Sequence, residues 1–144
     1  MRAAFAVLLG SACAAAAAAE YRSIEDNVAV LYDAPSRAAK PLYVVSKFYP
    51  LEVIVNLEGW VKVRDHTGAL TWVERKSLGA RRMVLVTAPY VEARQRAELA
   101  APAAFGAVQN VALELVEIAP EGWLRVRHAD GATGYVRAAQ VWGH

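Results

Sequence analysis

The chain has 144 residues, of which 16 are Lys or Arg and 14 are Asp or Glu, so its formal net charge is +2. This near balance argues against a nucleic-acid-binding role, because binding to a phosphate backbone requires a strong excess of basic side chains. Cys13 is the only cysteine, so the chain cannot form an internal disulfide.

The first part of the chain, residues 1–19, has the pattern of a secretory signal peptide. Arg2 supplies a positive charge, and an apolar stretch and a run of alanines follow it. We expect cleavage after Ala19 and a periplasmic or secreted mature protein, which then contains no cysteine. Lipidation of Cys13 is a less favoured alternative, because Gly10 stands three residues before it, where bacterial lipoprotein signals usually carry leucine.

The region after the signal peptide begins with a polar leader, residues 20–27. Short runs of β-forming residues bounded by turn residues then predict five strands and one helical turn. The strands are expected at 28–32, 42–45, 51–55, 60–64 and 69–73, and the helical turn at 75–78. These residues form a first domain over 28–78, and a short linker over 79–82 follows it.

A second set of strands follows the linker. They are expected at 83–86, 91–94, 104–108, 111–118, 122–128 and 132–136, with a closing segment at 138–142. The stretch 95–102 is predicted to be a loop, because Pro102 interrupts its alanine-containing pattern. The second domain therefore spans 83–144.

The second half of the chain repeats the first. Residues 51–54 (LEVI) return as 113–116 (LELV), and 58–64 (EGWVKVR) return as 121–127 (EGWLRVR). The offset is 62 residues before the Gly-Trp pair and 63 after it, which places one extra residue near 119–120. A period of this length predicts two copies of one small domain.

Alternation along the repeated strand separates its two faces. Val61 and Val63 point into a core, and Trp60, Lys62 and Arg64 point the other way. Many short strands with turn signals between them predict an all-β fold, as a small antiparallel barrel or sandwich.

The ordered motifs resemble the bacterial SH3 family. In repeat one the expected first strand, 28–32, is followed by residues 34–36 (APS). The Gly-Trp strand at 59–63, a glycine turn at Gly68 and an aromatic-Val pair at 72–73 come after it. Residues 122–126, 130–131 and 134–136 repeat the later motifs. This resemblance implies two tandem SH3-like, partly open barrels that bind cell-wall peptides or envelope protein segments. Thr71 departs from the family glycine that Gly134 keeps, and repeat two lacks the Pro-Ser pair.

Aromatic and basic side chains on the outward face are the candidate ligand-binding residues. Aromatic rings anchor ligands at recognition surfaces, and neighbouring cations can meet a carboxylate. The candidates are Trp60, Lys62, Arg64 and Trp72 in repeat one and Trp123, Arg125, Arg127 and Tyr135 in repeat two. Two alternatives stay open: the rings can instead pack the repeats together, and the cations can form a solvated strand face.

No residue pattern indicates catalysis. None of the serines has a nucleophile-elbow context, and the chain has no glycine-rich phosphate loop. His66 and His128 lie in turns of different repeats without the neighbours a metal site needs. We therefore expect no enzyme, cofactor or metal, and a binding module for peptidoglycan or envelope peptides. The alternative is a structural or regulatory subunit that docks one envelope protein.

Overall fold

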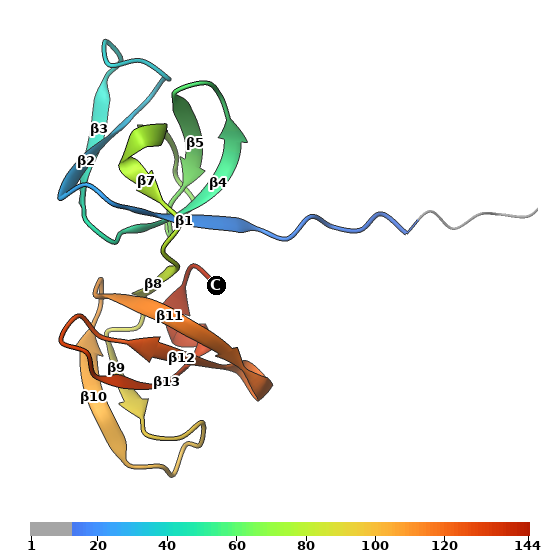
Figure 1. Ribbon diagram of the computed structural model, residues 1–144, viewed down its shortest axis with the longest axis vertical. Helices are drawn as coiled ribbons and strands as arrows, with labels where there is room; N and C mark the ends of the chain where they lie inside the picture. The colour runs from blue at the N-terminus through green and yellow to red at the C-terminus, as the bar shows by residue number, and fades with distance from the viewer. Residues whose placement is uncertain (1–12) are drawn as a thin grey trace, which may run out of the picture.

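The computed structural model describes residues 13–144, so the first part of the expected signal peptide lies outside the described residues. Residues 13–19 are exposed and have no regular secondary structure, and they extend away from the body of the molecule (Figure 1). Across 13–144, no helix is both long enough and apolar enough to span a membrane.

Each repeat forms one antiparallel sheet, and both sheets have the same strand order. In repeat one the order is β3-β2-β6-β5-β4-β1-β7, and in repeat two it is β10-β9-β13-β12-β11-β8-β14. The elements of repeat one are β1 (Glu20–Ile24), β2 (Val28–Tyr32), β3 (Pro41–Ser46), β4 (Pro50–Asn56), β5 (Trp60–Arg64), β6 (Leu70–Glu74), the 3-10 helix η1 (Arg75–Ser77) and β7 (Leu78–Gly79). Those of repeat two are β8 (Met83–Val86), β9 (Tyr90–Arg94), β10 (Ala103–Val108), β11 (Ala112–Ala119), η2 (Pro120–Gly122), β12 (Trp123–Arg127), β13 (Thr133–Arg137), η3 (Ala138–Gln140) and β14 (Val141–Trp142).

This arrangement confirms the predicted all-β fold with two tandem domains. Neither sheet closes on itself, as expected for a partly open barrel, and residues 13–144 contain no α-helix. The predicted helical turn after the last long strand is present as η1. The stretch 95–102 is irregular, as predicted.

The polar leader predicted over 20–27 is wrong, because its first five residues form β1. This strand pairs with β4, where Tyr21 lies opposite Glu52, and with β7, where Ser23 lies opposite Gly79. Ser23 is fully buried and its hydroxyl donates a hydrogen bond to the carbonyl of Arg81 at 2.7 Å. The polar composition of residues 20–24 does not indicate a strand. Ser23 can nevertheless be buried there, because its hydroxyl is hydrogen-bonded to the backbone of the linker.

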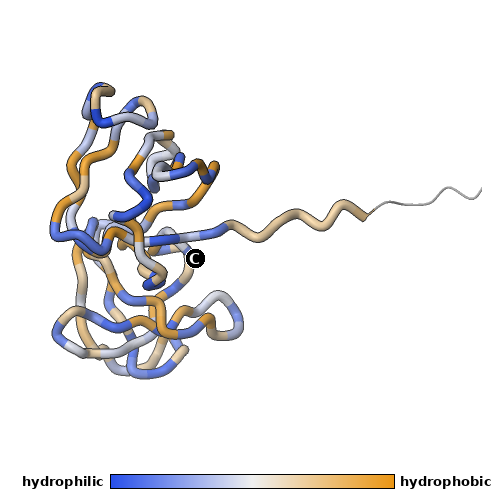
Figure 2. Tube along the Cα trace, turned by 45° about the horizontal axis from the view of Figure 1, so that its top comes forward, coloured by the Kyte–Doolittle hydropathy of each residue, from blue (hydrophilic) through white to orange (hydrophobic). Residues whose placement is uncertain are grey.

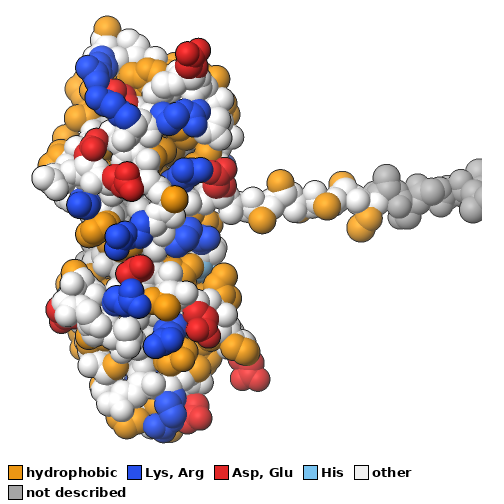
Figure 3. All heavy atoms as spheres, in the orientation of Figure 1, with side chains coloured by type: hydrophobic (Ala, Val, Ile, Leu, Met, Phe, Trp, Pro, Cys, Tyr) orange, Lys and Arg blue, Asp and Glu red, His pale blue; other side chains and the backbone are white. Residues whose placement is uncertain are grey.

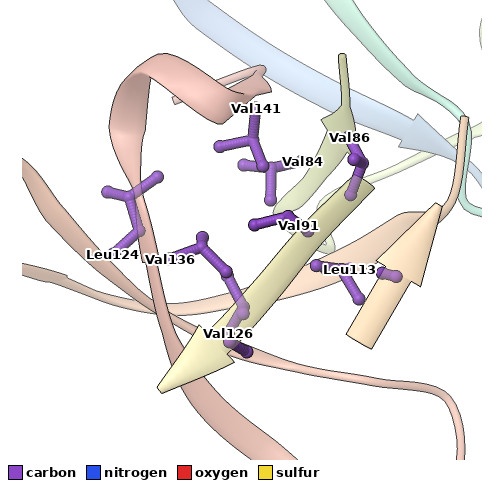
Figure 4. Packing of buried hydrophobic residues seen from close by; sticks show 10 residues of the cluster. Val84, Val86, Val91, Leu113, Leu124, Val126, Val136 and Val141 are labelled. Carbon is purple, nitrogen blue, oxygen red and sulfur yellow. The ribbon is translucent and has the colours of Figure 1, made fainter. Parts of the chain in front are cut away.

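Each repeat has its own hydrophobic core. The buried side chains of repeat one are Ile24, Ala29, Leu31, Leu51, Val61, Val63 and Val73. Those of repeat two are Val84, Val86, Val91, Ala93, Ala107, Leu113, Leu124, Val126, Val136 and Val141, and Figure 4 shows several of them meeting from different strands. Hydrophobic and hydrophilic segments intermingle along the chain (Figure 2), and in strands such as β5, β6 and β13 buried and more exposed residues alternate. The inward placement predicted for Val61 and Val63 is confirmed.

The hairpin between β5 and β6 is closed by a buried carboxylate. Asp65 accepts hydrogen bonds at one oxygen from the backbone N–H groups of Thr67 and Ala69, at 2.8 and 3.1 Å, and from the Thr67 hydroxyl. Gly68 has φ +89°, a left-handed conformation that glycine adopts without the steric cost of a side chain. The turn residues therefore fix the register that puts Trp60, Lys62 and Trp72 on one face.

The two repeats lie end to end with β1 at their junction (Figure 1). The ring of Tyr21 on β1 meets the ring of Trp142 on β14 edge to face, with centroids 5.4 Å apart. Trp142 also lies 6.5 Å from the His66 ring, and the Arg82 guanidinium stacks over Tyr21 at 5.4 Å. Aromatic contacts therefore join the repeats in addition to the short linker.

Candidate functional site

Aromatic side chains gather on the outward face of repeat one. The register places Lys62 opposite Trp72 across β5 and β6, and Tyr32 opposite Trp72 across β2 and β6. The Lys62 ammonium lies 5.9 Å from the centre of the Trp72 ring, and the rings of Tyr32 and Trp60 meet edge to face at 5.6 Å. These four half-buried residues, Tyr32, Trp60, Lys62 and Trp72, are called the aromatic face below.

Tyr32 is the member of the aromatic face that sequence reasoning missed. It ends β2, where Ala29 and Leu31 are buried and point into the core. Side chains alternate along a strand, so a residue next to Leu31 must point outward. The alternation therefore predicts that Tyr32 points outward. It does not predict that Tyr32 lies beside Trp72, which depends on the pairing of β2 with β6.

An ion pair holds the β2–β3 loop beside the aromatic face. Arg37 in this loop donates two hydrogen bonds to the two carboxylate oxygens of Glu74, at 2.8 and 2.9 Å. Glu74 lies directly opposite Trp60 in the sheet register. The hydrogen bonds from Arg37 lower the pKa of the Glu74 carboxyl below its usual value. The loop is therefore fastened at the edge of the aromatic face.

We expect the Glu74 carboxyl to titrate below 4.5, its ordinary value, in an NMR pH titration of the folded protein. A depressed pKa means that the ion pair adds stability above the unfolded-state pKa, and that this stability is lost as the pH falls through the folded-state pKa. Replacing Arg37 by alanine should bring the titration back towards 4.5. A Glu74 midpoint unaffected by that change would contradict the assignment.

Two of the candidate arginines already have carboxylate partners within the chain. Arg64 donates to Glu52 on β4 at 3.2 Å, and Arg127 donates to Glu114 on β11 at 3.3 Å. Arg125 lies opposite Glu117 in the β11–β12 register and opposite Tyr135 in the β12–β13 register. Lys62 is thus the predicted cation that the structure places against the aromatic rings of repeat one.

On the equivalent surface of repeat two the tryptophan is covered, while Arg125 and Tyr135 stay half-buried like Lys62 and Trp72. Trp123 is only 6% exposed, and the guanidinium of Arg137 stacks on its ring at 4.9 Å. Arg137 also donates a hydrogen bond to the carbonyl of Glu121 at 3.0 Å, which fixes it in that position. Arg137 lies opposite Trp123, as Glu74 lies opposite Trp60 in repeat one. Arg94 lies opposite Tyr135, as Tyr32 lies opposite Trp72. The two repeats therefore present different surfaces from the same fold.

The histidines serve local contacts. The Nδ1 atom of His66 lies 3.0 Å from the Tyr49 hydroxyl, and burial raises the pKa of that hydroxyl to about 12. His128 lies 3.1 Å from Asp130. The pKa of the Asp130 carboxyl is lowered mainly by the backbone N–H of Ala132 and further by His128. Among residues 13–144, no three His, Cys, Asp or Glu side chains gather closely enough to hold a metal ion.

Comparison with known families gives a match over both repeats. The model of the bacterial SH3 domain matches residues 25–79 and again residues 87–143. The two matches contain the aromatic face and the equivalent surface of repeat two.

Three solved structures have a similar chain path. They are NlpC2 from Trichomonas vaginalis (14% identity, TM-score 0.41, covering 87% of this chain and 48% of that one), NlpC1 from the same organism (14%, 0.41, 95% and 50%) and an NlpC/P60 family protein from Bacillus cereus (16%, 0.41, 85% and 56%). The chain spans about half the length of these structures. A comparison with curated proteins found no match.

Proposed function

Because the chain belongs to the bacterial SH3 domain family, with two copies of the domain, we propose that it is a non-enzymatic binding module of the cell envelope. Its ligand is a peptidoglycan stem peptide or another envelope peptide. The observation that carries the proposal is the aromatic face of repeat one, where three rings and the ammonium of Lys62 remain accessible to a ligand.

The aromatic face suits a ligand with both apolar and acidic parts. Tyr and Trp rings offer large, rigid contact area to peptide side chains and backbone. Lys62 adds a point charge that can meet a ligand carboxylate. Arg64 is less available, because Glu52 already accepts a hydrogen bond from it at 3.2 Å.

The polar side chains support binding more than catalysis. Ser23 donates its hydroxyl to the backbone of Arg81, and Ser36 accepts a hydrogen bond from the backbone of Ala38. The two turn histidines lie against Tyr49 and Asp130 and not against a serine. Nucleophilic catalysis requires a nucleophile and a base within hydrogen-bond reach, and these contacts use the candidates for other purposes.

We propose further that the protein acts in the periplasm or outside the cell. The support is the leader composition of residues 1–19, with Arg2, the apolar stretch and the alanine run. Mass spectrometry of the purified protein should find Glu20 at or within a few residues of the N-terminus. A retained Met1 would contradict export through this leader, and a lipid on Cys13 would support the alternative.

Co-sedimentation with purified sacculi tests the binding function. The folded protein should pellet with sacculi and be released by soluble stem peptides that carry free carboxylates. A parallel incubation with envelope lysate tests for a protein ligand. Failure to bind either material, with the fold verified by circular dichroism, would rule the proposal out.

The alternative of a subunit that docks one envelope protein is favoured by the edge strand β3. Within residues 13–144 this strand pairs only with β2, and its Leu42, Tyr43 and Val44 are exposed by 39%, 51% and 68%. An open, apolar sheet edge can accept an added strand from a partner. Cross-linking in cells distinguishes this alternative from the peptide-binding module. A single stoichiometric protein partner would favour the docking subunit.

A further inference from the structure

A groove lies at the junction of the repeats, away from the aromatic face. One part, of about 330 Å³, is lined by Phe48 and Arg81 on one side and by Met83, Ala112, Glu114 and Arg127 of repeat two among others. A second part, of about 270 Å³, shares Phe48 and Arg81 and adds Lys47. Neither part is lined by a residue of the aromatic face. We call both parts together the junction groove.

Phe48 has a backbone conformation that does not suit its side chain. Its φ is +72°, in the left-handed region that a bulky residue rarely adopts. The equivalent turn of repeat two carries Asn110 with φ +70°, and asparagine is one of the residues that tolerate this region. The backbone N–H of each residue donates a 2.8 Å hydrogen bond to the same strand position, Ile24 or Val86. The turn itself therefore favours asparagine and does not require the phenyl ring.

Two cations lie over the ring of Phe48. The ammonium of Lys47 is 5.3 Å and the guanidinium of Arg81 is 5.4 Å from its centre. Arg127 lines the same groove, and Lys and Arg side chains also mark the waist between the repeats on the face seen in Figure 3. The apolar ring and the nearby cations thus share one surface.

The cations of the junction groove exceed its carboxylates. Glu114 accepts a hydrogen bond from Arg127 at 3.3 Å and lies 4.0 Å from Arg81, and Glu25 lines the second part. Against these two carboxylates stand Lys47, Arg81 and Arg127. The side chains of Arg81 and Arg127 are still 54% and 45% exposed, so their remaining N–H groups can donate to a ligand.

We propose that the junction groove is a second binding site, which takes a peptide segment with a carboxylate next to an apolar side chain. The apolar side chain packs on Phe48 and Met83. The carboxylate lies among Lys47, Arg81 and Arg127, where a guanidinium can bind it with two parallel hydrogen bonds. This site is independent of the aromatic face and is lined by residues of both repeats and the linker.

NMR with the full chain and a defined probe tests this site. The probe is the peptide acetyl-Leu-Glu-Ala-Leu-Glu-amide, and its Gln-for-Glu version tests the carboxylates. We expect amide shifts at Phe48, Arg81 and Ala112 with the first peptide, and at least tenfold weaker binding of the second. Shifts confined to the aromatic face, equal binding of both peptides, or no shift at millimolar peptide would each overturn the proposal.

Two variants with a matched control sharpen the test. Phe48→Asn installs the residue that repeat two uses in this turn, so the fold should be retained while peptide binding falls at least tenfold. Arg81→Gln should weaken binding similarly, whereas Arg96→Gln removes a comparably exposed arginine on the 95–102 loop and should leave binding unchanged. A Phe48→Asn protein that still binds the peptide would overturn the proposal. The peptide experiments are separate from the sacculus experiment. A protein that binds the peptide but not sacculi would contradict the proposed role of the aromatic face and would support the junction groove as a site.

Discussion

Replacement of Trp60 by alanine is expected to weaken sacculus binding at least tenfold while the thermal midpoint changes little. The Trp60 ring is half-buried and packs edge to face on Tyr32 at the surface, so its removal opens no closed cavity in the core. Aromatic anchors at recognition surfaces commonly contribute about 2 kcal/mol or more to binding, and a tenfold loss corresponds to about 1.4 kcal/mol. Co-sedimentation and thermal unfolding of the same preparation measure both effects.

Trp123→Ala is the matched control, because Trp123 occupies the same place in repeat two. Its ring is 6% exposed and is covered by the Arg137 guanidinium at 4.9 Å. Truncating a buried aromatic residue typically costs about 3–5 kcal/mol of stability. We therefore expect a clear fall in the thermal midpoint of repeat two, with sacculus binding retained wherever the protein stays folded. Equal losses of binding in both variants would show that the two faces do not differ in the way described.

Much of the fold follows from local patterns in the sequence. The alternation of Val61 and Val63 with Trp60, Lys62 and Arg64 sets the buried face of β5, and the glycine turn at Gly68 sets its end. Both the alternation and the glycine turn are short-range signals, and each occurs in both halves of the sequence. They suffice for the all-β fold and the family.

The strand β1 could not be predicted in this way. Of its two buried residues, Ile24 is apolar but Ser23 is polar, and the buried Ser23 hydroxyl is satisfied by the Arg81 carbonyl from the linker. Tyr21 is partly covered by Trp142 of repeat two and by Arg82 of the linker. Contacts between segments so distant in sequence are set by the tertiary arrangement, which composition and alternation do not encode.

The difference between Trp60 and Trp123 was also beyond the sequence patterns. Both rings follow a Glu-Gly pair, and each begins the equivalent strand of its repeat, β5 or β12. What separates them is the residue across the sheet: Glu74 is drawn to Arg37 in the loop, and Arg137 stacks over the ring of Trp123. The change from carboxylate to guanidinium is visible in the sequence, but its effect becomes clear only with the register of β6 and β13. The ligand-binding roles of all eight candidate residues stay predictions.

Leu51→Ala and Leu113→Ala are expected to unfold different halves of the molecule. The two leucines hold equivalent places in the repeats, and each is fully buried in its own core. Removing a buried leucine side chain costs about 2.7–5 kcal/mol, and domains of roughly 60 residues have only a few kcal/mol to lose. Each substitution should therefore unfold its own repeat at a much lower temperature.

The other repeat should keep most of its stability, because the two cores share no residue. What joins the repeats is the linker and a few contacts at the junction, chiefly Tyr21 with Trp142 and His66 with Trp142. Aromatic pairs of this kind contribute about 0.5–1.5 kcal/mol each beyond their buried area, which is less than the loss of a core leucine. Calorimetry should thus show two transitions in each variant, and amide NMR should identify the surviving repeat. A single cooperative transition that shifts equally in both variants would mean that the junction couples the domains more strongly than these contacts imply.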